Sequence, residues 1–191
     1  MQKKLWLILC LFSLFIFVSC RTTSRQISYE NKSLFLTDDH IVNILPAKDF
    51  KENLELMQII DGEYNGQKYL IQTIVLLNST EISVIAFSAL GNTIYDLQYK
   101  NDDIIYNTVI DATGKSAAYM VADIQFCYYP VEKIREMLED AGLILDSYKN
   151  DRGWVRKIYN GDEEIISIKR EGNFIEYNNL LRNYKYSIEE I

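Results

Sequence analysis

The sequence predicts a mainly β domain of the α+β class, in which a strongly curved antiparallel sheet holds two inserted helices on its concave side. Short runs of β-branched and aromatic residues recur about every ten positions, and Gly, Asn and Asp separate them. Two segments in the middle of the chain have apolar residues at helical spacing instead. About nine or ten strands are too many for a flat sheet, so we expect the sheet to curl.

The expected strands lie on both sides of the helix pair. Those before the helices are residues 54–60, 68–77, 81–87, 93–99 and 103–109. Those after the helices are residues 143–148, 154–159, 164–169, 173–177 and 184–188. Asn160-Gly161 predicts a two-residue type I′ hairpin turn, because both central residues of that turn need a positive φ.

The two helices are expected at residues 116–128 and 130–141. Ser116 can serve as the N-cap of the first helix. Pro130 begins the second helix, at the position where the missing N–H of proline costs least, and Gly142 ends it as a C-cap. Small residues on the first helix would leave room above the sheet: Ala117, Ala118 and Ala122.

The beginning of the chain has the pattern of a bacterial export signal. Lys3 and Lys4 precede an apolar stretch that is shorter than the roughly twenty residues of a membrane-spanning helix. Phe17-Val18-Ser19-Cys20 resembles the lipobox of bacterial lipoproteins, with Phe17 where Leu is usual. This resemblance implies that Cys20 carries acyl chains, and each buried methylene contributes about 0.8 kcal/mol to anchoring. An ordinary secretory signal with a coincidental cysteine is the alternative.

These patterns divide the chain into three parts. Residues 1–19 are expected to be a lipoprotein signal peptide, residues 20–49 a lipidated tether with a docking segment that ends near Pro46, and residues 50–191 one domain with its own core. Arg21 follows the lipidated cysteine, whereas Asp at that place retains lipoproteins in the inner membrane of familiar Gram-negative bacteria. We therefore expect an outer-membrane lipoprotein that faces the periplasm.

Composition excludes several classes of function. The chain has 20 basic and 27 acidic residues, and an acidic protein lacks the basic surface that nucleic acids require. His40 is the only histidine, so a His-based zinc site is excluded and a catalytic triad would depend on this one residue. No Gly-rich phosphate loop follows a strand. We expect a protein that is not an enzyme, without catalytic residues, metal or cofactor, and with Cys127 as a buried structural thiol.

The concave face of a curved sheet must be filled, either by the helices or by a ligand. We expect apolar side chains of the sheet and of both helices to line this space. The ligand-cavity candidates are Met57, Tyr95, Leu97, Ala117, Met120, Val121, Ile124 and Met137. Methionine side chains adapt to irregular apolar contacts. A dry, packed core is the alternative for each of these residues.

Several segments together resemble a family of uncharacterised bacterial lipoproteins, domain of unknown function 3261. They are the lipobox, Ser88-Ala89-Leu90-Gly91-Asn92-Thr93, Ala122-Asp123-Ile124-Gln125-Phe126 with Tyr129-Pro130, and the closing segments 175–179 and 184–188. Leu90-Gly91-Asn92-Thr93 also resembles the outer-membrane lipoprotein receptor LolB. The resemblance implies the fold of LolA and LolB, an incomplete antiparallel β-barrel of about 9–11 strands around an apolar cavity.

The resemblance also implies a function. We expect a membrane-anchored lipoprotein that binds or passes an acyl or polyene-type ligand inside the half-barrel, with affinity from apolar burial at about 25 cal/mol per Å². The alternative is a non-catalytic scaffold or assembly lipoprotein with a filled core, which binds another envelope protein through an exposed apolar or tyrosine-rich surface. The 14 tyrosines of the chain are compatible with that alternative.

Overall fold

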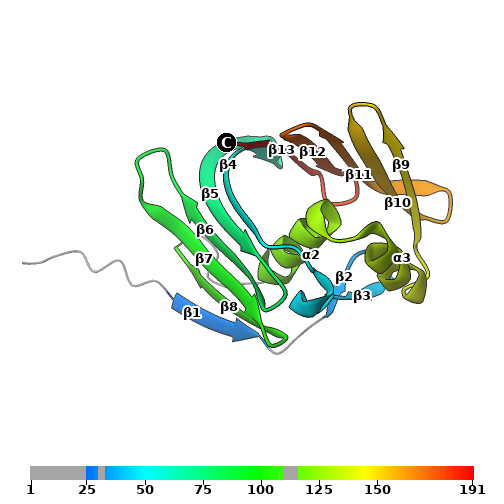
Figure 1. Ribbon diagram of the computed structural model, residues 1–191, viewed down its shortest axis with the longest axis horizontal. Coiled ribbons are helices and arrows are strands. Elements are labelled where there is room, and N and C mark those ends of the chain that lie inside the picture. The colour runs from blue at the N-terminus through cyan, green and yellow to red at the C-terminus, as the bar shows by residue number, and fades with distance from the viewer. Residues whose placement is uncertain (1–24, 30–32, 110–115) are drawn as a thin grey trace, which may run out of the picture.

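The computed structural model describes residues 25–29, 33–109 and 116–191 (Figure 1). Before the helices, the strands are β1 (Arg25–Tyr29), β2 (Ser33–Phe35), β3 (Ile41–Asn43), β4 (Leu54–Tyr64), β5 (Gln67–Leu77), β6 (Glu81–Phe87), β7 (Thr93–Lys100) and β8 (Asp103–Thr108). The helices are α2 (Ser116–Tyr128) and α3 (Val131–Asp140), and a short 3₁₀ helix, η2, spans Ala47–Asp49. After the helices come β9 (Ile144–Asn150), β10 (Gly153–Asn160), β11 (Glu163–Glu171), β12 (Phe174–Asn179) and β13 (Tyr184–Glu190).

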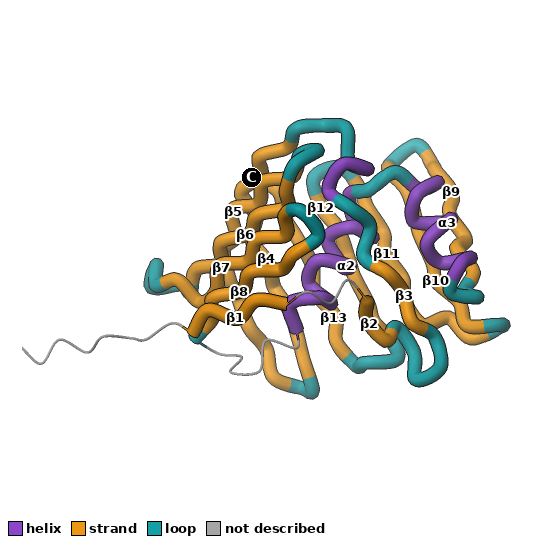
Figure 2. The backbone as a smooth tube through the Cα atoms, turned by 90° about the horizontal axis from the view of Figure 1, so that it is seen from below, coloured by secondary structure: helices purple, strands orange, loops and turns teal. Residues whose placement is uncertain are grey.

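Eleven of the described strands form one antiparallel sheet, in the order β1-β8-β7-β6-β5-β4-β13-β12-β11-β10-β9. Most strands that lie side by side in the sheet also follow one another in the sequence, as expected for hairpins. The sheet is not closed, since β1 and β9 are its two edges, and it curves strongly around the helices (Figures 1 and 2). The prediction of a mainly β fold with a large curved sheet and two helices is confirmed.

The helices occupy the concave side of the sheet (Figure 1). Pro130 is the N-cap residue of α3, and the helix ends before Gly142, whose φ is +78°. The backbone N–H of Leu143 donates to the carbonyl of Leu138, which closes the C-terminus in the way that a glycine in the left-handed region allows. The predicted boundaries of the second helix are therefore confirmed to within one residue.

The type I′ turn predicted at Asn160-Gly161 is wrong. Asn160 pairs with Glu163, so Gly161 and Asp162 are the central residues, and only Gly161 has a positive φ. A bulge after Ile158 shifts the register by one residue, so the central residues of the turn are 161 and 162 in place of 160 and 161. Two other hairpins have positive φ at both central residues, Asn65-Gly66 between β4 and β5 and Asn101-Asp102 between β7 and β8.

Residues 33–50 pack against the helices and are part of the folded domain. The apolar side chains of this segment join the common core: Leu34, Leu36, Val42, Ile44 and Phe50. The side chain of Gln125 on α2 bonds twice to the backbone of Leu45, accepting from its N–H at 3.0 Å and donating to its carbonyl at 2.6 Å. These bonds satisfy backbone groups that no strand pairs, so they hold the segment on the helix.

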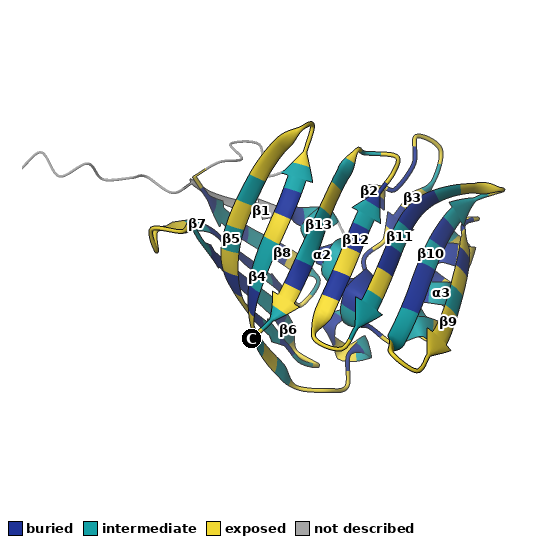
Figure 3. Ribbon diagram, turned by 90° about the horizontal axis from the view of Figure 1, so that it is seen from above, coloured by how far each residue is buried: buried dark blue, intermediate teal, exposed yellow. Residues whose placement is uncertain are grey.

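The core lies between the helices and the inner face of the sheet. Buried and exposed residues alternate along most strands, as Figure 3 shows, because successive side chains point to opposite faces. Cys127 is among the buried residues, at 3% exposure. Within the described ranges, no helix has the length and apolar character needed to cross a membrane.

Candidate functional site

Four of the predicted cavity residues meet in a packed part of the core. Tyr95 and Leu97 point inward from β7, and Ala117 and Val121 lie one turn apart on α2. Their exposed fractions are between 0 and 7%, and all four belong to the same apolar cluster. These side chains therefore fill the space between α2 and this half of the sheet.

A second face of α2 is less completely covered. Met120 and Ile124 are only partly buried, and they lie on the same helix face as Tyr128 because residues four apart are neighbours. The hydroxyl of Tyr128 accepts a hydrogen bond of 2.6 Å from Nε2 of Gln58 on β4. Met120 and Ile124 consequently face the central strands of the sheet.

We call the partly buried side chains of this region the inner strip. It consists of Ile60, Ile71, Met120, Ile124, Tyr184 and Tyr186, all of which pack against the buried core. Ile60 and Ile71 are direct cross-strand partners on β4 and β5. The inner strip thus joins two turns of α2 to the middle of the curved wall.

The burial of inward-facing residues changes along β5. Tyr69 and Ile71, near the start of the strand, are partly buried. Thr73, Val75 and Leu77, further along, are at most 3% exposed. Along β5, the inner strip is therefore more open to solvent at the end of the sheet where the strand begins than further along.

Polar side chains close the inner strip at its far end. Oγ1 of Thr73 donates to Oε1 of Gln58, and the amide of Gln58 donates in turn to the hydroxyl of Tyr128. That hydroxyl donates to Glu190 at 2.8 Å, and Glu190 forms a salt bridge with Arg170. The network satisfies the buried polar groups and ties α2 to four strands, β4, β5, β13 and β11.

Met57 is not on the inner face, so its prediction as a cavity residue is wrong. It is 54% exposed, whereas its neighbour Gln58 points inward and is 2% exposed. The one-residue alternation of the strand places Met57 on the convex face, beside Ile74 of β5. Met137 is buried on α3 and lies away from the inner strip, beside the segment that contains Leu45.

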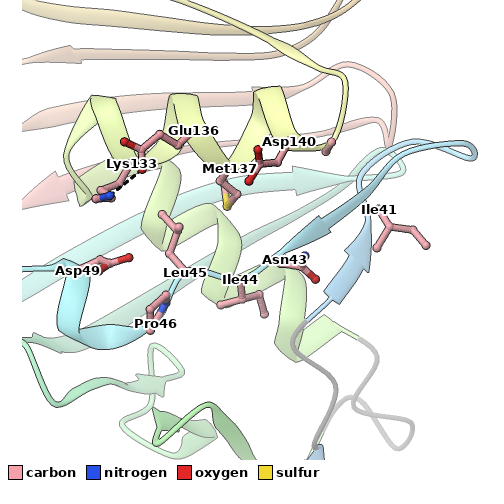
Figure 4. A pocket seen from close by; sticks show the side chains of 11 residues that line it. Ile41, Asn43, Ile44, Leu45, Pro46, Asp49, Lys133, Glu136, Met137 and Asp140 are labelled. Carbon is pink, nitrogen blue, oxygen red and sulfur yellow. Dashed lines mark hydrogen bonds and ion pairs between the residues drawn. The ribbon is translucent and has the colours of Figure 1, made fainter.

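A pocket of about 230 Å³ lies between α3 and residues 41–49 (Figure 4). Met137, Ile44 and Leu45 contribute apolar side chains, and Lys133 bonds to Glu136 at 2.6 Å on its rim. Typical small-molecule sites occupy about 300–1,000 Å³. This pocket is therefore too small for a long acyl chain.

A carboxylate surrounded by tyrosines lies beside the inner strip. Oδ1 of Asp123 on α2 accepts a hydrogen bond of 2.5 Å from the hydroxyl of Tyr177. Oδ2 accepts bonds from the hydroxyls of Tyr184 at 2.8 Å and Tyr186 at 3.4 Å. The three tyrosine rings are nearly parallel, with interplanar angles of 3–4°. We call these four residues the Asp123 cluster.

The Asp123 cluster has unusual proton affinities. Burial raises the pKa of Asp123 to about 7, and the hydrogen bonds from the three tyrosines oppose that rise only in part. Burial and the nearby Asp123 also raise the pKa of Tyr69 to about 12. A carboxyl group that titrates near neutral pH is a feature of many functional sites.

Sequence reasoning missed Asp123 and Tyr177. The alternation of Tyr184, Tyr186 and Ile188 indicated a tyrosine-bearing strand face, but nothing in the pattern showed what that face meets. Asp123 lies between apolar residues on a helix that carries few charges. This isolated carboxylate was the available sequence signal for a polar site inside the domain. Cys20, the predicted lipidation site, lies outside the described residues.

Comparisons with known proteins give a family and no function. Residues 55–191 match the model of a family described as "Protein of unknown function (DUF3261)". This match covers β4 to the end of the chain, and so includes α2, the inner strip and the Asp123 cluster. No curated protein matches the chain.

Proposed function

We propose that this chain, which belongs to the DUF3261 family of proteins of unknown function, is a membrane-anchored envelope lipoprotein that binds an acyl or lipid-like ligand along the inner strip. In this proposal Cys20 carries the anchoring lipid and the domain faces the periplasm from the outer membrane. The curved sheet with helices on its concave side is compatible with a half-barrel of the LolA/LolB type, and we include that fold assignment in the proposal.

The observation that carries the proposal is incomplete burial at the centre of the concave face. Inward side chains on both sides of the inner strip are almost fully buried, but Ile60 and Ile71 keep contact with solvent. Covering apolar area contributes about 25 cal/mol per Å². An acyl chain laid against these residues would complete the core without requiring any specific head group.

The end of the sheet that contains Arg25 supports a membrane-facing orientation. Strand pairing places the β6–β7 loop (residues 88–92), the β4–β5 turn and the β12–β13 loop at this end, which we call the Arg25 rim. Figures 2 and 3 show the β6–β7 loop projecting on the side of the molecule where β1 begins. Exposed apolar side chains at the Arg25 rim are Tyr64, Leu90, Val109, Leu180 and Leu181.

The turns at the opposite end of the sheet are polar. The described turns at this end are residues 78–80, 101–102, 151–152 and 172–173, and none carries a large apolar side chain. Cys20 precedes Arg25 by five residues, which span at most about 18 Å when fully extended. A lipid on Cys20 would therefore hold the Arg25 rim close to the bilayer, at the end where the inner strip is open.

The proposal can be tested by identifying lipids that copurify with the protein. The full chain is expressed with its own signal, extracted in mild detergent, and examined by native and lipid mass spectrometry. We expect a noncovalent acyl ligand in the wild type. Ile124→Trp, which fills the inner strip with a larger side chain, should reduce its occupancy several-fold.

Met57→Trp is the matched control, since it adds the same ring on the convex face. It should leave the bound lipid unchanged. A wild-type protein that is reproducibly empty, in detergent and after incubation with envelope lipids, would contradict the proposal. Equal losses in both variants would show that the lipid binds elsewhere.

A second candidate function is that of a non-catalytic scaffold for an envelope protein. The observation in its favour is that Met57 and Ile74, which are cross-strand partners on β4 and β5, are both exposed on the convex face. A photo-crosslinker at residue 74 in cells discriminates the two. A single specific protein adduct, together with an empty inner strip, would favour the scaffold.

A further inference from the structure

We infer that the Asp123 cluster is a head-group site that selects amphiphiles with a primary ammonium group over those with a neutral or anionic head. This inference rests on the proposed function, because it places the ammonium at the side of the inner strip where the acyl chain would lie. It adds the chemical class of the head group, which apolar burial alone does not specify.

The first argument is that Asp123 has no cationic partner. Among the described residues it forms no salt bridge within 4.0 Å. Arg182 is the cation whose charge acts on it, but the guanidinium of Arg182 stacks on Tyr119 and donates to the hydroxyl of that residue. A partly buried carboxylate without a counter-ion attracts an external cation strongly.

The second argument is the geometry of the acceptors. The carboxylate oxygens of Asp123 lie within hydrogen-bond distance of three hydroxyl oxygens, from Tyr177, Tyr184 and Tyr186. Each hydroxyl donates its proton to Asp123 and keeps lone pairs that can accept. A primary ammonium has three N–H donors, so it can bond to the carboxylate and to neighbouring hydroxyls together. Tyrosine rings also favour a nearby cation.

The third argument is location. Tyr184 and Tyr186 belong both to the Asp123 cluster and to the partly buried inner strip, so a ligand can contact both regions. Asp123 itself is only partly buried, and Tyr69, whose proton affinity is affected by Asp123, lies where the inner strip is open. The carboxylate of Asp123 would repel a ligand with an anionic head group. A ligand with a neutral hydroxyl head group would gain no charge interaction there.

Protonation should control this selectivity. The charged or titratable groups that act on Asp123 or are affected by it come from its own helix, from β5, β12 and β13, and from the β12–β13 loop. They are Cys127, Tyr69, Tyr177, Tyr184, Tyr186 and Arg182. All the tyrosines stay protonated at pH 6–8, because burial raises their pKa values. Ionisation of Asp123 therefore makes ammonium binding stronger as the pH rises through about 7.

The test compares three probes with the same chain length: tetradecylamine, tetradecanol and tetradecanoic acid. The protein is the mature chain with Cys20→Ser, secreted without acylation and free of detergent, and binding is measured by calorimetry and native mass spectrometry. At pH 8 we expect tetradecylamine to bind at least about tenfold more tightly than tetradecanol. The preference should shrink at pH 6, and Asp123→Asn should remove it while tetradecanol still binds.

Asp61→Asn is the matched control, because Asp61 is exposed on the neighbouring convex face of β4 and should leave the preference unchanged. The wild-type comparison does not depend on whether Asp123→Asn folds. Equal binding of the three probes at pH 8 would overturn the head-group inference and leave the proposed function standing. Failure of all three probes to bind would overturn both.

Discussion

The ring of Tyr69 on β5 lies directly over Gly62 of β4. A Cβ atom at Gly62 would lie 2.2 Å from Cζ of Tyr69 and 2.4 Å from its hydroxyl oxygen, so only glycine leaves room for this ring. Gly62 pairs with Tyr69 on one side and with Tyr186 on the other. The missing side chain thus lets Tyr69 lean across β4 towards the Asp123 cluster.

We predict that Gly62→Ala destabilises the fold and that removal of the Tyr69 ring rescues it. Overpacking of this kind costs on the order of 1–3 kcal/mol. In Gly62→Ala/Tyr69→Ala the new methyl group occupies space that the ring has left, so the double variant should be more stable than the sum of the two single effects. Urea unfolding of the four proteins measures this coupling. Purely additive losses would show that the two residues do not compete for space.

Asp123 should make the protein less stable at alkaline pH. Its pKa rises from 3.8 in a free side chain to about 7 in the fold, so the folded state binds this proton more tightly than the unfolded state. The resulting stabilisation is complete below about pH 4 and is lost as the pH rises through 7; its upper bound is on the order of 4 kcal/mol.

Urea unfolding between pH 5 and pH 8 tests this sign. The wild type should lose stability across the range relative to Asp123→Asn, whose amide does not titrate. Asp61→Asn should keep the wild-type slope. A wild type that gains stability towards pH 8 relative to Asp123→Asn would mean that the tyrosine hydroxyls stabilise the charged carboxylate more than burial destabilises it.

Arg156 should be needed for the C-terminal end of α2. Its guanidinium donates to the carbonyls of Phe126 at 2.5 Å and Tyr129 at 3.0 Å, and it stacks on Trp154. Burial lowers its pKa to about 10, so it stays charged at neutral pH. Arg156→Met should cost about 2–4 kcal/mol, because two buried carbonyls lose their donor. Arg156→Lys should recover only part of this, since an ammonium lacks the planar fork.

Gln125 should hold residues 33–50 on the domain. Gln125→Ala removes both bonds to the backbone of Leu45 and leaves an N–H and a carbonyl without their partner. We expect faster amide exchange in residues 41–50, with a much smaller change in β10 and β11. Hydrogen exchange with peptide-level mass spectrometry measures this difference. Uniformly faster exchange would instead indicate a loss of global stability.

Under the proposed function, Leu90 should contact the bilayer when the acylated protein is reconstituted in vesicles. It is 88% exposed at the Arg25 rim, whereas Ile191 is 73% exposed at the opposite end of the sheet. An environment-sensitive fluorophore on Leu90→Cys should shift to shorter wavelength in vesicles, and the same label on Ile191→Cys should not. Cys127 is buried and should resist labelling in the folded protein. Equal shifts at both positions would contradict the orientation.

The strands were the most predictable part of this protein. Period-two alternation and Asn or Gly turns place β4 to β8 and β9 to β13 within a few residues of the structure, because both signals are local. The hairpin between β10 and β11 was predicted, but its turn was misplaced by one residue, since a bulge after Ile158 depends on pairing with the neighbouring strand. Met57 was misplaced for a similar reason, as alternation gives two faces without saying which one is inside.

The amino-acid sequence by itself determined the secondary structure from β4 onward, the acidic composition and the likeness to exported lipoproteins, because these depend on residue type and short-range spacing. Tertiary structure alone decided which tyrosines meet Asp123. Tyr177 and Tyr184 are more than fifty residues from that carboxylate in the chain, and pairing of β12 with β13 beneath α2 brings their hydroxyls to it. Burial then raises the pKa of Asp123 to about 7, which no local sequence pattern encodes.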